Sequence, residues 1–336
     1  MTTADKCVHC HKCRDSCDFL AKYGIDIGDT DRLKELAFHC FLCGKCTAVC
    51  PLGIDGRETV LGFRREKAAS EEDLPSIEKS YKGLIKEKRD YKFSNWKRVK
   101  PAAGAGSGTA FFPGCNFPSM YPKTNAKLSE IFAEHGIGTV YECCGKPIAE
   151  LGMTEDEERI IEKIKARLPE NGISEIVTAC PNCRDFFGDK LGVEVKSVYT
   201  KLSELGIGNT VDGDAEFFVP CPDRTTRIWI EELRPFIKGD VSCTDAAQCC
   251  GLGGSAAMLE PDLADGFVEK LRGYASGSSE ADRERSGIYT YCASCMGRFR
   301  RKGLRNIDHI LPHILGTGEQ PDTGKSYINR VLTKIK

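Results

Sequence analysis

Cys143-Cys144-Gly145 and Cys249-Cys250-Gly251 are two copies of one motif, 106 residues apart, and each has further cysteines around it in the same order. One cysteine precedes each motif and a C-x2-C pair follows it, which gives Cys115 with Cys180 and Cys183, and Cys221 with Cys292 and Cys295. Two adjacent thiolates can reach different metals of one cluster, and glycine lets the backbone pass close to inorganic sulfide. Each half therefore offers five thiolates, one more than a tetrahedral zinc binds. Zinc remains the alternative for either C-x2-C pair taken alone, but the repeated set of five favours a larger metal cluster.

A second cysteine pattern lies near the start of the chain. The spacing C-x2-C-x2-C-x3-C occurs at Cys7, Cys10, Cys13 and Cys17, and again at Cys40, Cys43, Cys46 and Cys50. This is the spacing of two-cluster ferredoxins, in which the fourth cysteine of each run ligates the other cluster. The expected ligand sets are Cys7, Cys10, Cys13 with Cys50, and Cys40, Cys43, Cys46 with Cys17. The four sets hold 18 of the 19 cysteines and leave Cys243, for which we expect a buried, inert thiol.

The composition describes a chain of 336 residues with a formal net charge of −1. That length gives room for two or three domains, and the near-neutral charge gives no reason to expect a nucleic-acid partner. We expect neither a signal peptide nor a transmembrane segment, because no charged start precedes an apolar run and no apolar stretch reaches about 18 residues. The cysteines are therefore interpreted as reduced thiolates that hold iron in the cytoplasm, rather than as a secreted disulfide scaffold.

The front of the chain is expected to be helical. Residues 1–85 are predicted to form an α-helical ferredoxin-like domain, because Leu33, Leu36 and Ala37 line one helical face between the two ferredoxin motifs. Residues 86–108 are predicted to be a linker, with seven basic residues from 86 to 100 and a glycine- and alanine-rich stretch from 101 to 108. We expect the basic stretch to be a solvated connector that lies on a partner protein, and a polyanion or lipid headgroup site is the alternative.

The remaining chain is expected to fold as two tandem Rossmann-like α/β repeats, residues 109–212 and residues 213–336, the second with a closing C-terminal helix. Each repeat alternates short apolar strands with amphipathic helices, and its cysteines follow the strands, as Cys115 follows Phe112 and Cys180 follows Ala179. This alternation predicts a parallel sheet, in which sites lie at the C-terminal ends of the strands. The fold class is therefore α+α/β. The second repeat is six residues longer between its cysteines, which places an insertion near Ser276–Ser279.

Taken together, these motifs resemble the heterodisulfide reductases of methanogens. The repeated set of five cysteines is similar to the cysteine-rich CCG domain of these enzymes, and the front motifs resemble their separate small ferredoxin-like component. The fusion of the two parts in this order resembles the single catalytic chain of the cytochrome-linked heterodisulfide reductases. The resemblance implies two cubane [4Fe-4S] clusters at the front and one noncubane [4Fe-4S] cluster in each repeat. The implied noncubane ligands are Cys115, Cys143, Cys144, Cys180 and Cys183 in the first repeat, and Cys221, Cys249, Cys250, Cys292 and Cys295 in the second.

The function implied by the resemblance is reduction of a small disulfide, such as the CoM-S-S-CoB heterodisulfide of methanogenesis. Two facing noncubane clusters would each give one electron to one sulfur. The alternative is an electron-relay subunit of a flavin-dependent glycolate, lactate or glycerol-3-phosphate dehydrogenase, since such subunits share the Cys-Cys-Gly element. The complete C-x2-C pair in both repeats favours the disulfide reductase. The histidines that commonly flank the counterpart of Cys221 in the family are missing here, which leaves the substrate open.

The site is expected to need a partner and an anionic substrate. Basic residues next to the cysteines are candidate contacts for a sulfonate or phosphate, with sulfide hydrogen bonding or surface charge as the alternative: Lys146, Arg184, Arg224 and Arg298. His9, His11 and His39 are expected to donate hydrogen bonds to cluster sulfurs or to face solvent. The glycines after Cys250 are better explained by close approach to a cluster than by a dinucleotide, so no FAD or NAD is expected in this chain. Electrons would come from a flavoprotein or a membrane cytochrome b partner, with the chain cytoplasmic or peripheral at the membrane through that partner.

Overall fold

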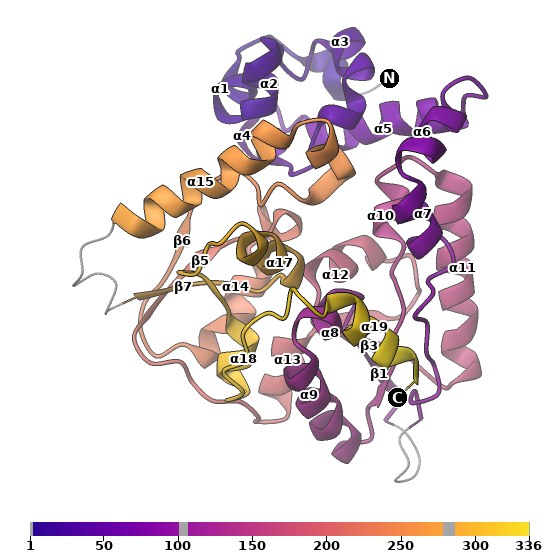
Figure 1. Cartoon of the computed structure of the whole chain (residues 1–336), viewed down its shortest axis with the longest axis vertical. Coiled ribbons are helices and arrows are strands. Elements are labelled where there is room, and N and C mark those ends of the chain that lie inside the picture. Colours follow the sequence, from indigo (N-terminus) through magenta and orange to yellow (C-terminus); the bar gives the residue numbers. More distant parts are fainter. Residues whose placement is uncertain (1–2, 101–106, 278–285, 336) are drawn as a thin grey trace.

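The front of the molecule is built from short helices. The computed structural model describes residues 3–100, 107–277 and 286–335. The elements of the front part are η1 (Thr3–Lys6), α1 (Lys12–Ser16), α2 (Asp18–Tyr23), α3 (Thr30–Glu35), η2 (Ala37–His39), α4 (Lys45–Val49), α5 (Gly56–Ala69), α6 (Leu74–Ser80) and α7 (Lys82–Lys88). The predicted helix between the two ferredoxin motifs is confirmed as α3, and Leu33, Leu36 and Ala37 are all buried. Figure 1 shows the first helices of this unit, α1 to α4, in indigo at one end of the molecule above α15, with α7 lower down beside α11.

The middle of the chain forms a four-stranded parallel sheet of order β2-β1-β3-β4. Its elements are β1 (Thr109–Phe112), α8 (Phe117–Met120), α9 (Pro122–Glu134), β2 (Gly138–Thr139), α10 (Lys146–Ala149), α11 (Thr154–Glu170), β3 (Glu175–Thr178), α12 (Pro181–Phe187), β4 (Glu194–Ser197) and α13 (Val198–Glu204). All four residues of the central strand β1 are buried, as expected for a parallel strand that helices cover on both faces.

The last third of the chain forms a second four-stranded parallel sheet, of order β6-β5-β7-β8. Its elements are β5 (Asp214–Phe218), η3 (Cys221–Asp223), α14 (Ile228–Leu233), η4 (Arg234–Phe236), β6 (Val241–Thr244), η5 (Gly253–Met258), α15 (Pro261–Gly277), β7 (Ser286–Thr290), α17 (Ala293–Arg301), β8 (Asp308–His309), α18 (Ile310–Ile314) and α19 (Ser326–Ile335). In each sheet the first strand lies between the second and the third. The predicted combination of helices with two parallel α/β sheets is therefore confirmed.

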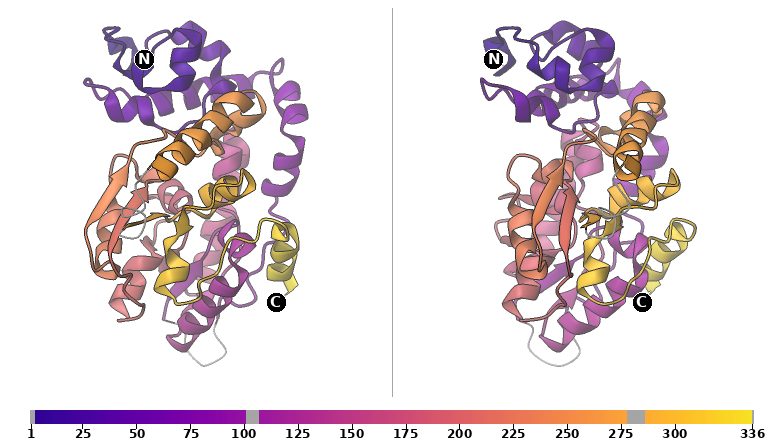
Figure 2. Two further views of the ribbon diagram at one scale, coloured as in Figure 1. Left: turned by 60° about the vertical axis from the view of Figure 1, so that its left-hand side comes forward. Right: turned by 90° about the vertical axis from the view of Figure 1, so that its left-hand side faces the viewer.

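One apolar core joins the parts of the molecule. It includes Phe41 from the front unit, Phe111 and Phe132 from the first sheet and its helices, and Phe217 and Phe267 from the second. The rings of Phe41 and Phe267 meet edge to face with centroids 5.1 Å apart. The views in Figure 2 agree that the front unit lies against α15. The two sheets and the front unit therefore share buried contacts.

The segment from residue 86 to residue 100 differs from the sequence prediction. Tyr91, Phe93 and Val99 are buried, and Asn95 exchanges backbone hydrogen bonds of 2.8 and 2.9 Å with Tyr141, beyond the end of β2. The expectation of a solvated connector is therefore wrong for these residues, because their apolar side chains pack beside the first sheet while most of the basic ones point outward. Of the expected linker stretch 101–108, residues 101–106 lie outside the described part.

Two further features lie toward the end of the chain. The insertion expected at Ser276–Ser279 begins inside α15, which ends at Gly277, and residues 278–285 lie outside the described part. The closing helix α19 packs by its polar side, where Asn329 and Thr333 are buried, beside α8 and the segment that contains Asn95. No helix in the described ranges is both long and apolar enough to cross a membrane.

Candidate functional site

The first five-cysteine site lies at the C-terminal ends of the first sheet. Cys115 follows β1, the Cys143–Cys144 pair follows β2, and Cys180 and Cys183 follow β3. The thiol of Cys143 contacts those of Cys115 and Cys144, Cys144 contacts Cys183, and Cys183 contacts Cys180. The five predicted residues are therefore brought together. Hydrogen bonds from Cys143 and Cys183 lower the pKa of Cys144 to about 5 although burial opposes this, which favours the thiolate that metals bind.

The second five-cysteine site has the same construction on the second sheet. Cys221 follows β5, the Cys249–Cys250 pair follows β6, and Cys292 and Cys295 follow β7. Cys250 contacts Cys249 and Cys295, and these contacts lower its pKa to about 6. The hydrogen bond from Cys295 lowers the pKa of Cys292 to about 7. Cys144 and Cys250 have matching contacts, each with the preceding cysteine and with the second cysteine of the C-x2-C pair.

The two ferredoxin motifs are brought together in the crossed arrangement that the sequence predicts. A small cavity at the tip of the front unit is lined by Cys7, Cys10, Cys13 and Cys50. Cys17 lies instead beside Cys40 and Cys46 of the second motif. Burial, and after it the proximity of Cys17, raises the pKa of Cys40 to about 12, and Cys17 also raises the pKa of Cys46. Each set therefore takes its fourth cysteine from the other motif.

Glycines mark the places where the backbone comes close to these thiols. A Cβ atom on Gly56 would lie 2.7 Å from the sulfur of Cys46, and one on Gly114 would lie 2.9 Å from the Cβ of Cys180. All 19 cysteines are free thiols. Converging thiols are a donor set that fits iron–sulfur clusters, and in the described residues the cysteines other than Cys243 come together in four groups.

The front unit and the second five-cysteine site meet at a direct contact between the thiols of Cys43 and Cys249. Gln248, the residue before Cys249, donates to the sulfur of Cys17 at 3.5 Å and to that of Cys43 at 3.8 Å. Its own side-chain oxygen accepts from the backbone of Asp18 at 2.6 Å. The second site therefore touches the Cys17, Cys40, Cys43 and Cys46 set.

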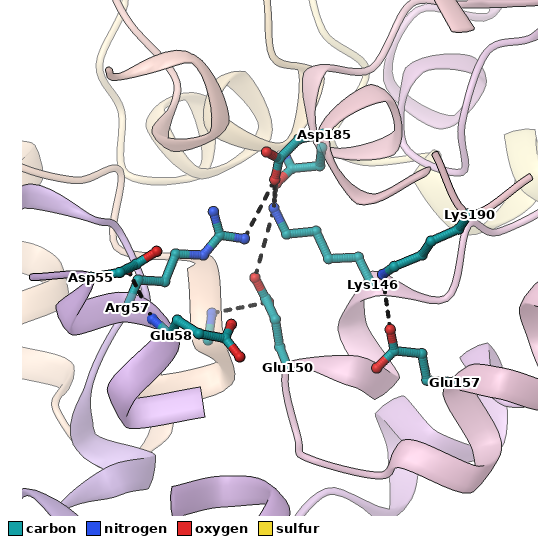
Figure 3. A network of polar contacts seen from close by, with 10 residues as sticks. Asp55, Arg57, Glu58, Lys146, Glu150, Glu157, Asp185 and Lys190 are labelled. Carbon is teal, nitrogen blue, oxygen red and sulfur yellow. Dashed lines mark hydrogen bonds and ion pairs between the residues drawn. The ribbon is translucent and has the colours of Figure 1, made fainter. Parts of the chain in front are cut away.

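The two five-cysteine sites face one another. Asn182, which lies between Cys180 and Cys183, donates to the sulfur of Cys292 at 3.6 Å, and Asn116 donates to Ser294 at 2.7 Å. Residues that follow β1 and β3 of the first sheet therefore contact residues that follow β7 of the second. Lys146 and Arg57 lie near Cys221, and Figure 3 shows both directed at Asp185, at 3.4 Å each. Lys146 is also 3.9 Å from Glu150.

Each of the four basic residues suggested by the sequence has a protein partner. Arg224 is buried and donates to the backbone oxygens of Cys43 and Gln248, so its role is to hold the contact with the front unit rather than to face an open site. Arg184 pairs with Glu232 at 2.8 Å and Arg298 pairs with Asp265. Lys146 also donates to Asn182 of the first site at 2.8 Å, and its charge partly offsets the rise that burial causes in the pKa of Cys221 of the second site. It therefore lies between the two sites.

Four residues of the site region were missed by sequence reasoning: Arg57, Arg64, Lys88 and Gln248. Lys88 ends α7 and is buried, with its ammonium facing the thiols of Cys115 and Cys143. Burial opposes its protonation, but Cys115 and Cys143 together with Tyr91 and Glu87 raise the pKa of Lys88. The residue lies in a basic run that looks like a solvated surface, so its sequence carries no signal of this placement.

The remaining expectations concern the histidines and Cys243. His9 and His11 both contact Asp26 through Nδ1 at 3.0 Å, and His39 contacts the buried carboxylate of Glu260 at 2.6 Å. Carboxylates therefore engage these rings through Nδ1. The expectation of a buried Cys243 is wrong: Cys243 lies in the edge strand β6 and is exposed, as is the neighbouring Ser242.

A cavity of about 700 Å³ lies away from the cysteines, between α9, β2, α19 and residues 97–100. Its lining includes Asn125, Ser129 and Tyr141 but no described cysteine. This cavity and the cysteine sites are therefore in different parts of the molecule.

Comparison with family models identifies both cysteine-rich parts. A model described as a 4Fe-4S dicluster domain matches residues 6–54, and one described as a cysteine-rich domain, CCG, matches residues 109–188. A crystal structure of a hypothetical protein from Helicobacter pylori is similar in fold, with a TM-score of 0.51 and 10% identity over 92% of this chain and 68% of that one.

Three curated relatives are similar in sequence. The B subunit of the CoM/CoB fumarate reductase of Methanothermobacter marburgensis is 24% identical over 79% of this chain and 62% of its own length. Uncharacterized iron–sulfur proteins of Methanocaldococcus jannaschii and Methanococcus maripaludis are 24% and 23% identical, over 82% and 94% of this chain. The chain spans 60 to 67% of the length of these relatives.

Proposed function

We propose that this chain, which carries a 4Fe-4S dicluster domain and a cysteine-rich CCG domain and is related to a CoM/CoB-type reductase subunit, is the disulfide-reducing subunit of an iron–sulfur oxidoreductase. The substrate is a small disulfide such as CoM-S-S-CoB. The name of one relative, the B subunit of a CoM/CoB fumarate reductase, supports thiols of this kind and a partner protein. The electron donor is a flavoprotein or a membrane cytochrome b, and the chain works in the cytoplasm or at the membrane surface through that partner.

The observation that carries the proposal is the pair of facing five-cysteine sites. Asn182 of the first site donates to the sulfur of Cys292 of the second at 3.6 Å, so the two sites lie in direct contact. A disulfide has two sulfur atoms that each become a thiolate, which calls for two equivalent sites. An electron relay needs a single group that changes charge and gains nothing from a matched pair.

The chain's own residues divide the work. The cysteines of the front unit would hold two [4Fe-4S] clusters and the two sets of five would hold two noncubane clusters, which would supply the two electrons that a disulfide takes up. Gln248 and Arg224 fix the contact between Cys43 and Cys249. Lys146 and Arg57 lie near Cys221 and are held there by their ion pairs with Asp185.

The test is disulfide reduction by the purified protein with a reduced viologen dye as donor, under anaerobic conditions. Cys144→Ser and Cys250→Ser are each expected to lower the rate more than about 100-fold, since even residues that only orient metal ligands typically cost about 10- to 100-fold. Cys243→Ser changes an exposed cysteine outside all four sets and is expected to leave the rate unchanged.

The iron content serves as the control for this assay. The unmodified protein should hold about 16 iron atoms, four per cluster. A protein with this iron content that reduces no disulfide, but passes electrons from a flavin-dependent hydroxyacid or polyol-phosphate dehydrogenase to a quinone, would replace the proposal with the relay function.

A further inference from the structure

Lys88 gives the first five-cysteine site a charge environment of its own. The residue is 8% exposed, and its ammonium faces the thiols of Cys115 and Cys143. Its nearest acid is Glu87, 2.9 Å away, and Glu87 also pairs with Arg330 of α19. Two cations therefore share one carboxylate, which leaves one positive charge beside the thiols.

The other acid close to this site does not cancel that charge. Glu142 directly precedes Cys143, and its carboxylate lies 3.9 Å from Lys163 and 3.7 Å from Arg167. It also accepts hydrogen bonds from Ser94 at 2.6 Å and Trp96 at 3.3 Å. The carboxylate is thus already compensated by cations of α11.

The second five-cysteine site has cations beside it as well. Lys146 and Arg57 lie near Cys221, but both pair with Asp185 and Lys146 also lies near Glu150. Two cations there face two carboxylates, as Figure 3 shows. These two cations are therefore matched by two carboxylates, and the buried guanidinium of Arg224, which donates to the backbone oxygens of Cys43 and Gln248, is a further positive charge on that side.

The surroundings of Lys88 strengthen its effect. Tyr91 and Phe93 are buried against Cys143, and Val331 of α19 packs against the same group of side chains. A charge interaction in such an apolar, water-poor environment is screened much less than one at the surface. The ammonium therefore acts on whatever the first set of cysteines binds more strongly than an exposed lysine would.

We propose that Lys88 is an electrostatic partner of the cluster at the first five-cysteine site and raises the reduction potential of that site. The proposal rests on the cluster-binding part of the proposed function. Reduction adds negative charge to a cluster, and a nearby positive charge favours the reduced form, because net charge and surroundings set the potentials of iron–sulfur clusters. Because the second site touches the front unit through Cys249 and Cys43, a raised potential at the first site favours the transfer of electrons from the second site on to the first.

The test is a redox titration followed by paramagnetic resonance, with the two sites assigned by Cys183→Ser and Cys295→Ser. Lys88→Met is expected to shift the one-electron equilibrium between the sites about tenfold toward the second, which corresponds to about 59 mV. Lys88→Arg keeps the charge and should stay close to the unmodified protein. Lys86→Met removes an exposed lysine of the same helix and should have no effect.

Glu87→Gln provides a test of opposite sign that leaves Lys88 in place. Removing the carboxylate is expected to raise the potential of the first site further. A Lys88→Met protein with full iron content and unchanged potentials would overturn the proposal. If Lys88→Met fails to hold the first cluster, a Glu87→Gln shift that is absent or downward would overturn it instead. Failure of disulfide reduction in the unmodified protein would remove the proposed reaction and leave these shifts measurable.

Discussion

The guanidinium of Arg64 lies where three parts of the chain meet. It is fully buried and donates to the backbone oxygens of Ala37 at 3.0 Å and Cys40 at 2.7 Å in the front unit. It also donates to Glu150 of the first repeat at 2.6 Å and to Gly254 of the second at 2.8 Å. One side chain therefore satisfies four carbonyls that have no access to water.

Arg64→Met should weaken the packing of these three parts against one another. The change leaves the four buried carbonyl oxygens without this donor, and we expect the apparent free energy of unfolding to fall by about 3 kcal/mol or more. Anaerobic denaturant unfolding measures it. The matched control is Arg65→Met, whose side chain is 37% exposed and pairs with Glu58, and which should change stability by less than about 0.5 kcal/mol. Equal stability of the two variants would contradict the assigned role.

At the scale of single residues, the sequence predicts which cysteines lie together, but it does not predict which other residues pack around them. Cysteine spacing reflects the local geometry that cluster binding requires, so the cysteine groups that the structure brings together could be predicted from the sequence. Arg64 and Lys88 lie in charged helices, where a buried arginine or lysine looks the same as a solvated one. Only long-range contacts, such as that between Arg64 and Gly254, distinguish them.

Among the elements, η5 determines how closely the front unit packs against the second repeat. Gly254 has a φ of 62°, a conformation that favours glycine, and a Cβ atom there would lie 2.7 Å from the backbone oxygen of Cys40. The backbone of η5 therefore lies directly against the second ferredoxin motif. This close approach also brings Cys249 to Cys43.

Gly254→Ala should loosen that contact. Backbone strain and the collision with Cys40 are expected to lower the apparent free energy of unfolding by about 1–3 kcal/mol and to speed hydrogen exchange in residues 40–43. Gly266→Ala on α15 meets open space and should be neutral or stabilising by up to about 1 kcal/mol. If Gly254→Ala and Gly266→Ala have the same stability and the same hydrogen exchange in residues 40–43, the contact with η5 does not hold the front unit in place.

The sequence predicted the regular elements for a physical reason. Short apolar strands that are followed by cysteines and alternate with amphipathic helices favour a parallel sheet covered by helices. The two sheets have the same strand order. The segment containing Tyr91 and Phe93 was misjudged because its basic residues dominate the composition while its few apolar residues are the ones buried. The partner of Asn95 beyond the end of β2 is distant in sequence, so no local pattern reveals it.

Across the whole molecule, the cysteine sets form a directional arrangement. The set with Cys10 lies at the tip of the front unit and is partly exposed, the set with Cys43 lies behind it, and Cys43 touches the second five-cysteine site. The first five-cysteine site lies beyond, beside Lys88. This order suits electrons that enter at the tip and reach a substrate held between the two repeats.

The central claim is that substrate sulfur binds at the five-cysteine sites, and one measurement tests it most directly. The protein is oxidised in the presence of coenzyme M, or of another small thiol, labelled with a magnetic sulfur isotope, and its paramagnetic resonance spectrum is recorded. We predict a signal that requires the thiol, broadens with the isotope and disappears in Cys144→Ser. A spectrum that is identical with and without thiol, in a protein with its full iron content, would contradict the account.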